Sequence, residues 1–137
     1  MEQRLNILLV DDDEVDAITV KRAFGASPVP CQVTVARDGL EALAVLRAGK
    51  LPRERLLVLL DINMPKMGGI EFLGEVRADP ALQNLVVIVM TTSSEDNVRV
   101  DAYQLRVAGY VLKPVTFQAL EKIVATLGSY WTLMQLP

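Results

Sequence analysis

The chain has 137 residues, of which 51% are hydrophobic and 23% charged, and its formal net charge is −3. The usual size of about 150 residues per domain predicts one domain, and the apolar content with a small net charge excludes a disordered chain. The slightly acidic balance argues against a broad nucleic-acid-binding face, which needs an excess of basic residues. The absence of histidine excludes Ser-His and Cys-His catalysis and any histidine-based metal site.

Cysteine content and hydropathy favour a cytoplasmic protein without a membrane segment. The only cysteine is Cys31, so no disulfide can form within the chain, which fits a reducing compartment. Every apolar run is far shorter than the roughly 18 residues that span a bilayer. The apolar stretch near the start is too short for a signal peptide and ends in three aspartates.

Five short apolar segments alternate with longer segments of helical periodicity. The strands predicted from them are Leu5–Val10, Gln32–Ala36, Leu56–Leu60, Leu85–Met90 and Tyr110–Leu112. The first, third and fourth are almost wholly apolar, which is typical of strands in a parallel sheet covered on both faces. The second alternates between apolar and polar residues and the fifth is short, so both are predicted to be edge strands.

The intervening segments carry helix signals. Asp38 is predicted to cap the helix that follows it, because an acid stands three residues later. Ser93 precedes acidic residues in the same manner. The apolar stripe from Phe117 to Met134 keeps one helical face, so the last helix is predicted to continue past Gly128.

Repeated strand–helix alternation predicts right-handed βαβ units in a three-layer α/β/α sandwich, with a five-stranded parallel sheet in the order 2-1-3-4-5. We expect one domain over residues 1–137, with a core over about 5–127 and a C-terminal helical extension over 128–137. Because the sequence ends shortly after the last helix, no output domain is expected.

In an open α/β sheet, ligands bind beyond the carboxyl ends of the strands. The residues expected there are Asp11, Asp12, Asp61, Thr91 and Lys113, whereas Asp13 is assigned to a helix cap. Converging carboxylates stay ionised only around a cation, and oxygen ligands suit magnesium. A lysine can neutralise a phosphate and a threonine hydroxyl can donate to it. The set therefore predicts phosphoryl transfer to a carboxylate, which needs mainly positioning and charge neutralisation.

Four segments resemble motifs of the receiver domain of two-component response regulators, in the family's order. They are ILLVDDDEVD, LLDINMPKMGG, VIVMTTS and GYVLKP, and the resemblance extends from about Leu5 to Leu127. It implies the flavodoxin-like receiver fold and a phosphoacceptor role for Asp61, supplied by a phosphohistidine on a sensor histidine kinase. It also implies Mg²⁺ binding by the side chains of Asp12 and Asp61, by the backbone carbonyl of Asn63, and by Asp11 through water.

The same resemblance assigns roles on the other side of the site. It implies that Lys113 pairs with Asp61 or with the phosphoryl oxygens, and that the Lys113–Pro114 peptide is cis. It implies further that Thr91 turns inward toward the phosphoryl group and that Tyr110 follows, which changes the surface of helix 4, strand 5 and helix 5. Such chains take part in their own phosphorylation and dephosphorylation but are not otherwise enzymes.

The final segment, GSYWTLMQLP, is rich in apolar residues. Packing of a helix on its own sheet would explain it, and so would an exposed patch that pairs two chains. The ending is similar to that of small stand-alone regulators paired with phytochrome-type, light-sensing histidine kinases in bacteria. That similarity implies such a kinase as partner, and a homodimer through the helix 4–strand 5–helix 5 face and the C-terminal segment.

Other interpretations compete with an endpoint regulator. The chain could be a phosphate sink or a relay intermediate. A haloacid-dehalogenase-type phosphatase also uses an aspartate nucleophile, but its D-x-D motif is replaced here by Asp61-Ile62-Asn63. No P-loop or dinucleotide-binding glycine motif occurs. A degenerate receiver that acts only as a binding module is disfavoured because Asp12, Asp61, Thr91 and Lys113 are all present.

Overall fold

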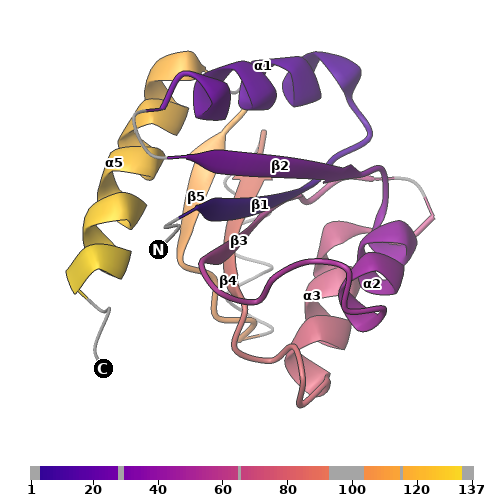
Figure 1. Ribbon diagram of the computed structural model, residues 1–137. Helices are drawn as coiled ribbons and strands as arrows, with labels where there is room; N and C mark the ends of the chain where they lie inside the picture. The colour runs from indigo at the N-terminus through magenta and orange to yellow at the C-terminus, as the bar shows by residue number, and fades with distance from the viewer. Residues whose placement is uncertain (1–3, 28–29, 65, 93–103, 115, 134–137) are drawn as a thin grey trace.

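The computed structural model describes residues 4–27, 30–64, 66–92, 104–114 and 116–133, with side chains up to residue 126. Five parallel strands form one sheet in the order β2-β1-β3-β4-β5, which confirms the predicted fold class and strand order. The strands are β1 (Leu5–Val10), β2 (Cys31–Ala36), β3 (Leu56–Asp61), β4 (Val86–Thr91) and β5 (Gly109–Leu112). Figure 1 shows α1 (Glu14–Gly25) and α5 (Phe117–Leu133) on one face of the sheet, and α2 (Gly39–Arg47) and α3 (Gly69–Ala78) on the other.

The central strands are buried on both faces because both helical layers cover them. Every residue of β1 and β3 is buried, whereas β2 is only partly buried at the sheet edge. The sequence therefore predicted correctly that β1 and β3 are buried and that β2 is an edge strand, from near-continuous apolar runs in the first two and an alternating pattern in the third. Alternate side chains of each strand enter two separate cores, one on each side of the sheet.

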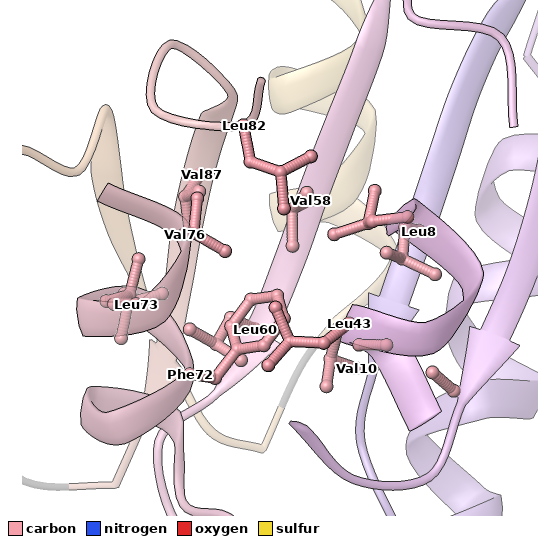
Figure 2. Close-up of a cluster of buried hydrophobic side chains, with 14 of the residues drawn as sticks. Leu8, Val10, Leu43, Val58, Leu60, Phe72, Leu73, Val76, Leu82 and Val87 are labelled. Atoms are coloured by element: carbon pink, nitrogen blue, oxygen red, sulfur yellow. The ribbon is translucent and has the colours of Figure 1, made fainter. Parts of the chain in front are cut away.

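The core between the sheet and helices α2 and α3 lies beneath the acidic strand ends. Figure 2 shows Val58 and Leu60 of β3 packed with Phe72 and Val76 of α3 and with Leu43 of α2. Each of these side chains is at most 4% exposed. Burial of such a side chain stabilises the fold by about 1.5–3 kcal/mol, so the end of β3 rests on a rigid base.

Two aspartates begin helices, as the sequence predicted. The Asp13 carboxylate accepts hydrogen bonds from the backbone N–H groups of Val15 and Asp16, and caps α1. The Asp38 carboxylate accepts a hydrogen bond from Glu41 N–H at 2.9 Å and caps α2. Each cap satisfies N–H groups that have no partner within the helix.

The element bounds differ from the predicted ones by one residue at several ends. Asp61 and Thr91 are the last residues of β3 and β4 rather than residues that follow them, because each still has a register partner on the neighbouring strand. The last helix passes Gly128 and reaches Leu133, as predicted. The helix expected after Ser93 lies outside the described residues. Within the described part of the chain, no helix is long and apolar enough to cross a membrane.

Gly69 lies where α3 begins against the end of β3. A β-carbon built at this position would stand 2.7 Å from the carbonyl oxygen of Asp61 and 2.7 Å from Cα of Ile62. Both are backbone atoms, so they cannot yield as a flexible side chain would. At Gly74, in the same helix, an added β-carbon meets no atom within 4 Å.

We therefore expect opposite effects from the same substitution at two positions of α3. Gly69→Ala should lower the free energy of unfolding by about 1–3 kcal/mol through overpacking. Gly74→Ala should raise it by about 0.5–1 kcal/mol, because alanine favours the helix interior. Urea unfolding followed by circular dichroism measures both. A Gly69→Ala variant as stable as the parent chain would contradict the close approach of α3 to β3.

Candidate functional site

The carboxyl ends of the central strands bring three acidic side chains together. Val10 pairs with Leu60 in the β1–β3 ladder, which places Asp11 beside Asp61. One carboxylate oxygen each from Asp11, Asp12 and Asp61 lies within 4.8 Å of the other two. Asp11 and Asp61 are buried, whereas Asp12 is exposed. The structure thus brings together the acids that the sequence placed at the ends of two neighbouring strands.

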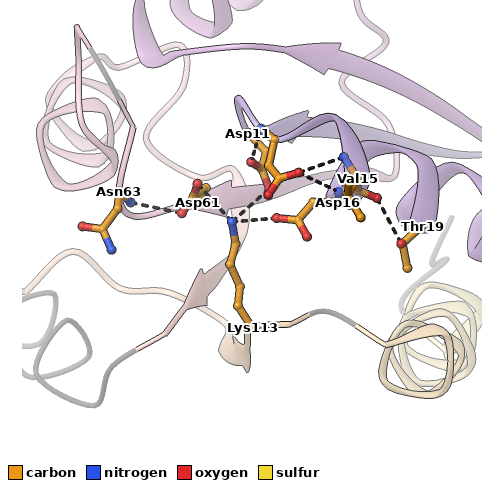
Figure 3. Close-up of polar contacts among 8 residues, drawn as sticks. Asp11, Val15, Asp16, Thr19, Asp61, Asn63 and Lys113 are labelled. Atoms are coloured by element: carbon orange, nitrogen blue, oxygen red, sulfur yellow. Dashed lines mark hydrogen bonds and ion pairs between the residues drawn. The ribbon is translucent and has the colours of Figure 1, made fainter.

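Lys113 extends from the end of β5 into this acidic cluster. Its Nζ lies 3.1 Å from Asp61 Oδ2, 3.3 Å from Asp11 Oδ2 and 2.7 Å from Asp16 Oδ2. Figure 3 shows the ammonium group at the point where these three carboxylates meet. The lysine side chain is 14% exposed, so the contacts are only weakly screened by water.

Asp16 was not among the predicted site residues, although it belongs to the first motif of the sequence. Asp16 is buried together with Val20, Ala23 and Phe24 of α1. These residues stand four, seven and eight positions after Asp16, which puts an acid on the core-facing stripe of the helix. That pattern was the signal that could have identified Asp16.

Burial and charge crowding shift the pKa values of this cluster. Burial raises the pKa of Asp11 to about 7, with further increases from Asp16 and Asp61, while the Asp13 N–H and Lys113 oppose the shift. Burial also raises the pKa of Asp61 above its usual range, although the hydrogen bond from Asn63 N–H and the charge of Lys113 both act to lower it. Burial alone would lower the pKa of Lys113, but the surrounding carboxylates outweigh it and raise the pKa above the ordinary value.

The donor set fits a hard divalent cation. Four carboxylates, counting Asp16, gather at this end of the sheet, and three of them contact the single ammonium group of Lys113, so negative charge is in excess. Among the described residues, the clustered potential metal ligands are carboxylates only, which suits magnesium, manganese or calcium better than softer ions. Burial is the main cause of the raised pKa of Asp11, with Asp16 and Asp61 adding to it, and a bound cation would favour the ionised carboxylate.

The loop after β3 is held at both of its ends. The N–H of Asn63 donates to Asp61 Oδ1 at 3.1 Å, and the N–H of Gly69 donates to the carbonyl of Ile62 at 3.0 Å. Farther along, Met67 packs against Gly39 at the start of α2, where an added β-carbon would stand 2.8 Å from Met67 Cγ. These contacts fix the loop that presents Asn63 beside Asp61.

Thr91 and Tyr110 lie on adjacent strands and on the same face of the sheet. Val89 pairs with Tyr110 and Thr91 pairs with Leu112 in the β4–β5 ladder. Because side chains alternate between faces along a strand, Thr91 and Tyr110 share the face of Val89. Thr91 is 1% exposed, and Tyr110 is half-buried against the core on the α2 and α3 side.

The Lys113–Pro114 peptide bond is cis, as the sequence resemblance implied. Asp13 is absent from the acidic cluster of the described residues and serves as the cap of α1. Ser93, two positions after Thr91, lies outside the described residues.

Comparison with known proteins identifies the family. A family model described as the response regulator receiver domain matches residues 7–125. Response regulator Rcp1 of Synechocystis is 35% identical over 129 residues, which cover 91% of this chain and 87% of Rcp1. A solved Mn²⁺-bound form of Rcp1 has a TM-score of 0.74 at 34% identity and covers 93% of this chain and 94% of its own.

Two further solved structures are similar. The bacteriophytochrome response regulator RtBRR is 34% identical with a TM-score of 0.79, covering 92% of this chain and 79% of its own. The phosphorylated cyanobacterial phytochrome response regulator RcpA is 35% identical with a TM-score of 0.76, covering 94% of both chains. The chain therefore belongs to the response regulator receiver family, whose members are signalling proteins that interact with histidine kinases.

Proposed function

We propose that Asp61 accepts a phosphoryl group from a phosphohistidine on a sensor histidine kinase. The observation that carries the proposal is the environment of its carboxylate. Asp61 is 4% exposed, one oxygen accepts the N–H of Asn63, and the other faces the ammonium of Lys113. The similarity to RcpA, which has been solved in a phosphorylated form, supports the same chemistry here.

The transfer requires one bond to form and one to break. A carboxylate oxygen of Asp61 attacks phosphorus, and the phosphorus–nitrogen bond of the donor histidine breaks. The electron pair leaves with the imidazole nitrogen, and Asp61 becomes an acyl phosphate. Lys113 neutralises the developing phosphoryl charge, and the hydroxyl of Thr91 donates to a phosphoryl oxygen. The chain itself needs no histidine, because the donor supplies it.

We assign the divalent cation of this reaction as Mg²⁺. The side chains of Asp12 and Asp61 and the backbone carbonyl of Asn63 would hold it, with Asp11 acting through water. When bound, it would supply the positive charge that lets several carboxylates and a phosphoryl group share one pocket. The clustered oxygens of Asp11, Asp12 and Asp61 and the Mn²⁺-bound form of Rcp1 support this assignment.

Thr91 and Tyr110 are proposed to transmit the signal. A phosphoryl group adds nearly two negative charges and strong acceptor oxygens, which would draw the Thr91 hydroxyl inward. Tyr110 would then move into the vacated space on the same sheet face and change the surface formed by β5 and α5. The shared face of Thr91 and Tyr110 supports this coupling.

The kinase partner is proposed to be of the phytochrome type, because the similar proteins RtBRR and RcpA are a bacteriophytochrome and a cyanobacterial phytochrome response regulator. Exposed apolar side chains next to the site offer a docking surface on α1. Val15 is 69% and Ile18 is 53% exposed, and Val15 precedes Asp16, which contacts Lys113. Singly exposed apolar residues are common, but these two lie on the helix that carries Asp16, the residue in contact with Lys113.

We further propose a cytoplasmic homodimer that forms through β5, α5 and the C-terminal segment. β5 is an edge strand of half-buried and exposed residues, and Leu112 in it is 67% exposed. A partner chain on this face would cover that edge and would sense the position of Tyr110. A kinase that draws on ATP would meet its substrate in the cytoplasm.

Incubation with acetyl phosphate and MgCl₂ tests the acceptor directly. Intact-mass spectrometry should show the gain of one phosphoryl group, and Asp61→Asn should abolish it because the amide is not a nucleophile. Asp79→Asn, at an acid outside the acidic cluster of the described residues, should be phosphorylated like the parent chain. Undiminished phosphorylation of the Asp61→Asn variant would contradict the assignment.

Neutralising Asp11 should stabilise the metal-free fold. The folded-state pKa of Asp11 is about 7, above the ordinary 3.8. Ionisation of this carboxyl therefore lowers the free energy of unfolding as the pH rises from about 3.8 to above 7. At pH 8 in EDTA, Asp11→Asn should raise Tm on the order of 5 °C, while its side-chain oxygen can still accept the Asp13 N–H. The gain should shrink when MgCl₂ is added.

Asp79 provides a control for this measurement, because its substitution should change Tm in the opposite direction. The hydrogen bond from Ala81 N–H, with Arg47 nearby, lowers the pKa of Asp79, so its ionised form stabilises the fold. Asp79→Asn should therefore lower Tm slightly at pH 8. Equal Tm changes for Asp11→Asn and Asp79→Asn would contradict the destabilising effect of the ionised, buried Asp11 carboxylate.

A substitution on α1 should separate docking from chemistry. Ile18→Glu should slow phosphotransfer from a phosphorylated bacteriophytochrome histidine kinase by at least about tenfold, since a charge in an apolar contact is costly. The rate with acetyl phosphate should not change. Leu40→Glu, at an equally exposed apolar residue of α2, should affect neither rate. Absence of transfer from this kinase to the parent chain would refute the phytochrome pairing.

A further inference from the structure

Asp16 makes the shortest contact with Lys113 among the acidic residues of the site. Its Oδ2 lies 2.7 Å from Lys113 Nζ, compared with 3.1 Å for Asp61 Oδ2. Asp16 is only 8% exposed, although it belongs to the first turn of a surface helix. The lysine that is to bind the phosphoryl group is therefore paired most closely with another carboxylate.

The helix does not itself require a buried carboxylate at this position. Asp13 already accepts the N–H groups at the start of α1, and Glu14 places an acid in the first turn while 79% of its side chain stays exposed. An acid in the first turn favours the helix from an exposed position as well. Burial of Asp16 costs solvation free energy, and Lys113 is the charge that offsets it.

The ammonium group of Lys113 has a limited number of donors. It carries three N–H groups, and three carboxylates lie within contact distance. Phosphorylation adds nearly two negative charges at Asp61, and the new oxygens need the same ammonium group. Asp16 lies beside Lys113 before any phosphoryl group is present.

We infer that Asp16 is a positioning residue that competes with the phosphoryl group for Lys113. The inference rests on the phosphoacceptor function proposed above and adds a regulator of that site. It has two consequences of opposite sign. The charge of Asp16 strengthens binding of a divalent cation, and it weakens the hold of the site on phosphoryl oxygens.

The variant Asp16→Asn tests both consequences, because it removes the charge and nearly keeps the shape. Binding of MgCl₂ alone is measured by thermal shift, and binding of beryllofluoride, a phosphoryl mimic, is measured at saturating MgCl₂. The dissociation constant for Mg²⁺ should rise about tenfold, and that for beryllofluoride should fall by a similar factor. Asp16→Glu, which keeps the charge, should stay closer to the parent chain in both measurements.

Two controls separate this role from a general charge effect. Glu14→Gln removes a negative charge from the same helical turn, on a side chain that pairs with Arg37 instead of Lys113, and should change both constants less than twofold. In a Lys113→Gln background, the gain in beryllofluoride affinity from Asp16→Asn should shrink, because the competition needs the ammonium group.

Several results would overturn the inference. Provided that the parent chain binds both probes, three results would contradict it. The first is an Asp16→Asn variant with unchanged dissociation constants for Mg²⁺ and beryllofluoride, and the second is weaker binding of beryllofluoride by that variant. The third is a gain in beryllofluoride affinity from Asp16→Asn that is just as large in the Lys113→Gln background. If the parent chain shows no magnesium-dependent beryllofluoride binding, or if Asp61→Asn binds it equally well, the phosphoacceptor function fails and the inference fails with it.

Discussion

The ammonium group of Lys113 allows several carboxylates to meet at one end of the sheet. Asp11, Asp16 and Asp61 each place an oxygen within 3.3 Å of it, in surroundings that exclude most water. Without a shared cation, such acids would repel one another and favour protonation. One lysine still leaves an excess of negative charge, so the site is compact and yet incompletely neutralised. The residual negative charge favours binding of a divalent cation, whose positive charge would then favour phosphoryl transfer to the site.

The fold supplies the rigidity that this arrangement needs. β1 and β3 lie at the centre of the sheet with helices on both faces, so their ends cannot separate when charges are brought close. α3 approaches the end of β3 so closely that Gly69 leaves no room for a β-carbon. The stability of the cores thus opposes the electrostatic cost at the strand ends.

The sequence predicted the strand order and most of the site because the signals were periodic and local. Apolar runs located the strands, and parallel strands place their carboxyl ends at one edge, which gathered Asp11, Asp61 and Lys113. Asp16 was missed because an acid in the first turn of a helix has an ordinary explanation in capping and the helix dipole. The left-handed backbone of Lys66 in the loop after β3 was likewise not predicted from the sequence.

The titration of Lys113 tests the central interaction most directly. Carbon-detected NMR of the lysine side chains in metal-free protein can follow the ε-carbon of Lys113, assigned by comparison with Lys113→Arg. The surrounding carboxylates hold the pKa of this group above the ordinary value of 10.5, so its signal should remain unshifted where exposed lysines titrate. A Lys113 that loses its proton together with the exposed lysines, or at lower pH, would contradict the account.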